Sequence, residues 1–356
     1  MSEREKRQNL ITKAYLMIRE INNMPKSNRR LTLIHKVDAL ASFMYYIGYL
    51  NLREYHDILN KIIQNDEISM CHKRQNEVFI NLFENNNLLL QEYQESLEDF
   101  NGIKIKKHDT KVNYEKVYGV FVDFLKHLDI YSMYKEMIKS DMIKSGSKKA
   151  KVNIMQDGIC IDNVGSSYIV LGNLDKNNFD YFSALIHELG HAYVNKIIGK
   201  EKLNYYDGEI YREIIPILFE RMFVDYLFKS RALDNNKMQN IVLSKEIIAY
   251  YNLLLARDAA SVIKRDYKSV NHMNYLNYSK LLSNKGDDVT PFIHHYALGY
   301  LISSKLFDDY KKDDELFIEE LPSIIRDLSK LDVENLLKQK YLKKDEETTY
   351  KMKKSS

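Results

Sequence analysis

Hydrophobic residues recur at spacings of three and four along most of the chain, which places them on one face of an α-helix. Within residues 113–140 the apolar positions form one such stripe: Val117, Val120, Phe121, Phe124, Leu125 and Leu128. Glycine and proline, which interrupt helices, are scarce at 12 and 4 of 356 residues. The pattern predicts a mainly α protein whose first helices cover about 5–22, 30–48, 51–66, 73–98 and 113–140.

The helical pattern changes near the middle of the chain. Residues 139–151, KSDMIKSGSKKAK, are polar and basic and contain Gly and Ser, which indicates a boundary between an N-terminal helical lobe (1–148) and a C-terminal domain (149–356). The segment after it carries β-branched residues and two glycine-containing turn signals, so we expect a short β-hairpin at about 152–172. Asn and Asp residues then begin a helix through 179–197, FDYFSALIHELGHAYVNKI.

Composition narrows the class of protein. Hydrophobic residues make up 45% and charged residues 29%, as in soluble globular proteins, and a net charge of +3 gives no footprint for nucleic acid. The most apolar run, 39–50, is too short to span a bilayer, and the charged N-terminus MSEREKRQNL lacks the apolar core of a secretory signal. Cys71 and Cys160 form no metal spacing. We therefore expect a cytoplasmic protein with free thiols and neither a nucleic-acid partner nor a membrane anchor.

The helix at 179–197 carries the candidate chemistry, H-E-L-G-H at 187–191. Positions four apart share a helical face, so His187 and His191 can offer two imidazole nitrogens to one zinc ion at roughly 2.0–2.1 Å each. Glu188 lies about 100° further around the axis and can reach a metal-held water without binding the metal. The pattern predicts two zinc ligands and a general base on one helical turn. The alternative is an ordinary helix with these residues together by chance.

A catalytic zinc ion usually has a third protein ligand, and residues 209–228 supply a candidate. Glu213 and Glu220 are seven positions apart in an otherwise apolar segment, where an uncompensated carboxylate is costly. We expect Glu213 to complete a site for one Zn²⁺ per chain, and Glu220 to orient a ligand histidine. The alternative is that Glu213 belongs to an exposed cluster and pairs with Arg212.

Two further residues indicate how this segment packs. Gly190 is a poor helix former, so its place within the helix predicts that the hairpin or the third-ligand helix lies close against its backbone. Pro216 fits either the first turn of a helix that starts near Glu213 or a kink in a longer helix.

A third segment, residues 291–306 (PFIHHYALGYLISSKL), groups His294, His295, Tyr296 and Tyr300 at the start of an apolar helix. Neutral His N–H and Tyr O–H groups are suitable donors to the oxyanion that forms when water attacks a carbonyl. The alternative is core packing, which is the commoner role for any one of 27 tyrosines.

Taken together, HELGHAY, EIIPILFE and HHYALGYLISSKL resemble, in this order, signature regions of the oligoendopeptidase F and thimet oligopeptidase family of zinc peptidases. The resemblance covers about 152–310 and implies a helical, zincin-like fold with a small sheet before the active-site helix. It also implies that an edge strand of the hairpin pairs with an extended peptide. The chain departs from the family in two ways: Val194 stands where members often have a further histidine, and the N-terminal lobe is shorter.

The resemblance implies roles for seven residues: the zinc ligands His187, His191 and Glu213, the general base Glu188, and the transition-state donors His294, Tyr296 and, as a further candidate, Tyr300. We therefore expect a cytoplasmic zinc-dependent metallopeptidase that hydrolyses short or unstructured peptides. One alternative is a regulatory zincin that cleaves one specific protein partner, against which the long N-terminal helical half argues. The other is a non-catalytic helical peptide-binding protein with a degenerate site, against which the intact motif argues.

Overall fold

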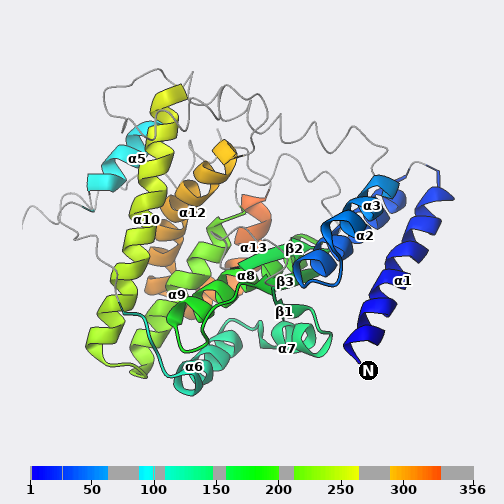
Figure 1. Cartoon of the computed structure of the whole chain (residues 1–356). Helices are drawn as coiled ribbons and strands as arrows, with labels where there is room; N and C mark the ends of the chain where they lie inside the picture. The colour runs from blue at the N-terminus through cyan, green and yellow to red at the C-terminus, as the bar shows by residue number, and fades with distance from the viewer. Residues whose placement is uncertain are drawn as a thin grey trace, which may run out of the picture. The chain divides into compact units, whose positions relative to one another are not determined.

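The computed structural model describes residues 2–25, 27–62, 88–98, 100, 109–146, 158–199, 212–263 and 289–329, and most of them are helical (Figure 1). The mainly α fold with a small sheet, expected from the apolar periodicity, is confirmed. The chain forms two compact units. The first contains α1 to α3, α6 to α8, the strands, α9 from Ile215 and α10 up to Glu246. The second contains α5, the rest of α10, α12 and α13.

The first unit begins with three helices, α1 (Glu3–Asn22), α2 (Asn28–Tyr46) and α3 (Leu52–Ile62). Ser2 and Ser27 cap the first two by accepting hydrogen bonds from backbone N–H groups of the first turn. Apolar side chains from all three helices share one core. These bounds match the predicted 5–22 and 30–48, and also 51–66 apart from 63–66, which lie outside the described residues.

The predicted single helix at 113–140 is wrong, because the structure has two helices, α6 (Tyr114–His127) and α7 (Tyr131–Lys139). Asp129, between them, has a φ of 54°, and the N–H of Ile130 donates to the Leu125 carbonyl at 2.9 Å. This bond and the left-handed residue end α6 in a Schellman motif. An apolar stripe alone does not reveal such a stop, since asparagine and aspartate tolerate the left-handed conformation without glycine.

A three-stranded sheet follows α7. Its strands are β1 (Ile143–Ser145), β2 (Gly158–Asp162) and β3 (Ser167–Leu171), in the order β1-β3-β2. The antiparallel pair β2–β3 confirms the predicted hairpin, apart from residues 152–157, which lie outside the described part. Val164 and Gly165 turn the hairpin with φ values of 50° and 83°, both positive as in a type I′ turn. The parallel strand β1 was not predicted, and the expected domain boundary at residue 148 lies outside the described residues.

The sheet lies between α2 on one face and α8 (Phe179–Ile198) on the other (Figure 1). On the first face, Tyr168 stacks on Phe43 of α2 with ring centroids 4.5 Å apart. On the second face, Nδ2 of Asn195 in α8 donates to Oγ of Ser167 at 2.9 Å. Because successive strand residues point to opposite faces, β3 is buried along its whole length and contacts both layers.

The helix α8 agrees with the predicted 179–197. Asn178 caps its start by accepting a hydrogen bond from the N–H of Asp180, and Gly199, with a φ of 49°, ends it. Most of its residues are buried, as its apolar flanks indicated.

The helix α9 (Ile214–Ser230) places Pro216 in its first turn, which confirms the first of the two expected arrangements. The backbones of α8 and α9 approach closely there. A Cβ atom built on Gly190 would lie 2.7 Å from Cα of Pro216. Of the two elements expected to pack against Gly190, α9 is the one that does so.

The remaining helices are α5 (Leu88–Glu98), α10 (Asn235–Ile263), α12 (Val289–Lys312) and α13 (Asp314–Leu328). The described α5 matches the end of the predicted 73–98, whose residues 73–87 lie outside the described part. Tyr310 and Phe317 join α12 to α13 by an edge-to-face ring contact. Among the described helices, none combines the length and the apolar character that crossing a bilayer requires.

The contact at Gly190 predicts opposite effects for two glycine-to-alanine substitutions. We expect Gly190→Ala to lower the free energy of unfolding by about 1–3 kcal/mol, because its Cβ meets the α9 backbone. We expect Gly119→Ala, in α6 with open space around it, to raise it by about 0.5–1 kcal/mol through helix propensity. Urea unfolding of both variants checks this, and equal stabilisation by both would contradict the close approach of α8 and α9.

Candidate metal centre

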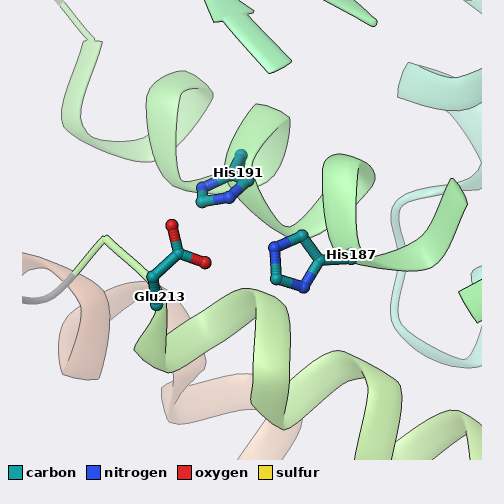
Figure 2. Close-up of side chains that lie close together, drawn as sticks. All are labelled: His187, His191 and Glu213. Atoms are coloured by element: carbon teal, nitrogen blue, oxygen red, sulfur yellow. The ribbon is translucent and has the colours of Figure 1, made fainter. Parts of the chain in front are cut away.

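Three side chains converge at the start of α9. His187 and His191 project from successive turns of α8, and Glu213 precedes the first residue of α9 (Figure 2). Each offers one ligand atom, and these atoms all lie within 4.8 Å of one another. A tetrahedral zinc ion holds its ligand atoms roughly 3.4 Å apart, so small side-chain rotations would let the three share one ion. The group could therefore hold a metal ion.

The three candidate ligands are removed from bulk water. The exposed fractions are 9% for His187, 8% for His191 and 4% for Glu213. The alternative of Glu213 in an exposed cluster is therefore wrong. Two neutral imidazoles and one carboxylate are a donor set that suits zinc, and a buried carboxylate beside them is compensated when a cation is bound.

A carboxylate on α9 holds one of the two histidines. Oε1 of Glu220 accepts a hydrogen bond from Nδ1 of His187 at 2.7 Å, which confirms that Glu220 contacts a candidate ligand. The other oxygen, Oε2, accepts from Oγ of Ser183 at 2.5 Å and from Nζ of Lys245. Burial by itself would raise the pKa of Glu220, but the Lys245 charge and the His187 hydrogen bond outweigh it and hold the pKa well below its usual range.

The side chain of Glu188 lies against the sheet. Its exposed fraction is 6%. A Cβ atom built on Gly158, the first residue of β2, would lie 2.9 Å from both Cγ and Oε1 of Glu188. The glycine therefore leaves the space that the Glu188 side chain occupies. The structure places a carboxylate next to a candidate metal ligand in sequence and against the start of a strand in space.

Comparison with known proteins gives a likeness of fold at low identity. No family model matches the chain, and no curated protein matches it. A crystal structure from Bacillus anthracis strain Ames, provisionally named an oligoendopeptidase F, is 13% identical with a TM-score of 0.47. The match covers 87% of this chain and 58% of that one. A second X-ray structure with the same provisional name is 13% identical with a TM-score of 0.44, covering 87% and 60%.

This chain thus spans less than two thirds of either matched structure. Likenesses of this size leave the chemistry to be decided by the side chains of the site themselves.

The predicted donors of residues 291–306 lie on α12, in the second unit. His294 is fully buried, and its ring stacks on Tyr93 of α5 with centroids 5.9 Å apart. Oη of Tyr93 and Nδ1 of His294 are 3.3 Å apart, within hydrogen-bonding distance. The ring of Tyr300 packs near Phe100, with centroids 6.1 Å apart. The roles of His294, Tyr296 and Tyr300 in catalysis stay predictions.

Sequence reasoning missed three residues around the candidate metal centre. Ser183 lies one turn before His187 on α8, so the helical spacing contained a signal for it. Gly158 stands in a turn-like segment, and Lys245 lies 25 positions after Glu220, so neither position points to α8 in the sequence alone.

The burial of His294 predicts a pH dependence of stability. Burial lowers the pKa of His294 to about 3, below the ordinary 6.5, with His295 contributing in the same direction. The unfolded chain therefore binds a proton on His294 that the folded protein refuses. Above pH 6.5, His294 costs the folded protein no stability. As the pH falls from 6.5 toward about 3, protonation of His294 in the unfolded chain progressively lowers the free energy of unfolding. We expect His294→Gln to flatten the decline of the free energy of unfolding in this range.

Urea unfolding at a series of pH values measures this effect. His56→Gln, at an exposed position of α3, is the matched control and is expected to keep the slope of the parent protein. The same slope in the His294→Gln variant would contradict the assignment, whatever its absolute stability.

Proposed function

We propose that this chain is a zinc-dependent metallopeptidase that hydrolyses peptide bonds in short or unstructured peptides. The observation that carries the proposal is the convergence of two imidazoles and one carboxylate in a buried position, with a further carboxylate, Glu188, beside them on the same helical turn. This is the set of groups that metal-assisted hydrolysis of an amide needs.

Each side chain has a role in this proposal. His187, His191 and Glu213 would hold the zinc ion, which supplies a Lewis acid that lowers the pKa of a bound water. The carboxylate of Glu188 takes a proton from the attacking water and returns it to the nitrogen of the leaving amine. Glu188 is not one of the three converging ligands, so the proposal assigns both proton transfers to its carboxylate.

The strand β2 supports an extended peptide as the substrate. It stands at an edge of the sheet formed by the described strands. The N–H of Asn163 donates to the Ser166 carbonyl across the turn, so by alternation the backbone groups of Gly158 and Cys160 point away from β3. A peptide that pairs with this edge would pass Gly158, against which Glu188 lies.

The α12 residues complete the proposal as donors to the oxyanion. With a pKa of about 3, His294 is neutral at physiological pH and carries one ring N–H. Tyr296 and Tyr300 are half-buried and offer phenolic O–H groups.

Removal of the general base tests the proposed reaction. We expect Glu188→Gln to slow the cleavage of quenched-fluorescent peptides by roughly 10²- to 10⁴-fold while one zinc per chain is retained, because only the proton acceptor is lost. Glu136→Gln, exposed on α7, is the control and is expected to cleave at the rate of the parent protein. A chelator should abolish cleavage, and added zinc should restore it.

Three outcomes would contradict the proposal. Parent-like cleavage by Glu188→Gln would remove the base assignment. A parent protein without stoichiometric zinc would favour the degenerate peptide-binding protein. Cleavage of one folded protein but of no random peptide would favour the regulatory zincin.

The contact between Gly158 and Glu188 gives a second prediction for the same assay. We expect Gly158→Ala to slow cleavage by roughly 10- to 100-fold, because its methyl group displaces the Glu188 carboxylate. Zinc content should not change, since the three atoms nearest to the added methyl group all belong to Glu188. The stability loss should be small because the Glu188 side chain can rotate. The Gly119→Ala variant serves as control, and an unchanged rate in Gly158→Ala would show that β2 does not position the base.

A further inference from the structure

The carboxylate of Glu220 is enclosed by donors from two other helices. Ser183 and His187 reach it from α8, and Lys245 reaches it from α10. All of these residues belong to the first unit. In an apolar helix such as α9, a buried carboxylate is costly unless a cation and hydrogen-bond donors compensate it. Of the three donors to Glu220, Lys245 is the one that carries a positive charge in its ordinary state.

The donors divide the two carboxylate oxygens between them. Oε2 accepts from Ser183 and Lys245, whereas Oε1 faces Nδ1 of His187. An ionised carboxylate only accepts hydrogen bonds, so Nδ1 of His187 must carry the hydrogen. Nε2 then keeps its lone pair and is the nitrogen available to a metal.

We propose that Lys245 is a positioning residue that, by holding Oε2 of Glu220, fixes the tautomer of His187 and so presents Nε2 to the metal before any metal binds. The proposal rests on the zinc site of the proposed function. It extends that site to a third helix, since a residue of α10 sets which nitrogen of an α8 histidine can act as a ligand.

The ammonium group of Lys245 compensates the negative charge of Glu220, which the hydroxyl group of Ser183 cannot do. Ser183 and a neutral His187 are both uncharged, so without Lys245 the carboxylate keeps an uncompensated charge in a buried place. The carboxylate of Glu220 is then more stable when it turns toward another partner. This movement weakens its hydrogen bond with His187, which selects the Nδ1–H tautomer. Lys245→Met keeps most of the side-chain stem and removes only the charge and the donor.

The test measures the tautomer of His187 directly in metal-free protein. With histidine labelled by ¹⁵N, and at mildly alkaline pH where histidines are neutral, the ring-nitrogen signals distinguish the two tautomers. The His187→Gln variant identifies the signals of His187 by their disappearance. We expect one tautomer, protonated at Nδ1, in the parent protein and a mixture in Lys245→Met.

The zinc affinity, measured by competition with a chelator, is the second readout. We expect it to fall roughly 10- to 100-fold in Lys245→Met. Lys229→Met is the matched control, because Lys229 forms its ion pair with Asp225 on α9. This control is expected to keep both the tautomer and the affinity of the parent protein.

Each outcome supports or overturns the proposed role of Lys245. A single Nδ1–H tautomer together with parent-like zinc affinity in Lys245→Met overturns the proposal, and so does a lower melting temperature without a change of tautomer, which would make Lys245 a structural residue. If Lys245→Met does not fold, Lys245→Gln replaces it with the same expectations. Neither readout involves a peptide, so a parent protein that binds zinc and cleaves nothing would overturn the peptidase proposal and leave this one standing.

Discussion

The candidate metal centre depends on the backbone contact between α8 and α9 at Gly190 and Pro216. The histidines belong to one of these helices, and both glutamates that approach them belong to the other or directly precede it. Only a residue without a Cβ at position 190 lets the two helices come this close. Near this contact, Glu213 lies close to both histidines and Glu220 contacts Nδ1 of His187.

Charge compensation is the second constraint on this region. Glu188 and Glu213 are buried, and Glu220 contacts His187, so these carboxylates lie where water screens charge weakly. Lys245 compensates Glu220, and a bound cation would compensate Glu213. Glu188, the third of these carboxylates, lies against Gly158 at the start of β2.

The local part of this architecture could be predicted from the sequence. Helical spacing placed His187 and His191 on one face, and the cost of a carboxylate in an apolar segment pointed to Glu213 and Glu220. The β-branched residues and the two glycine-containing turn signals located the hairpin. These inferences succeeded because each depends on residues fewer than about ten positions apart, where spacing alone determines direction.

Contacts between distant segments could not be predicted in this way. Lys245 contacts Glu220, and β1 pairs with β3, because whole helices and strands pack together. The end of α6 depends on the left-handed conformation of Asp129, which no apolar pattern reveals. The roles of the α12 residues likewise depend on more than spacing. Their aromatic neighbours, such as Tyr93 beside His294, come from a helix some 200 positions earlier.

The position of the sheet between α2 and α8 gives the N-terminal helices a function that their own sequences do not suggest. Tyr168 and Val170 point into the core of α1 to α3, while the neighbouring positions of the hairpin support α8. A protein shortened to its histidine-bearing half would expose one apolar side of a three-stranded ribbon to water. Any truncation intended to isolate the reactive part must therefore keep the first sixty or so residues, or supply another cover for that ribbon.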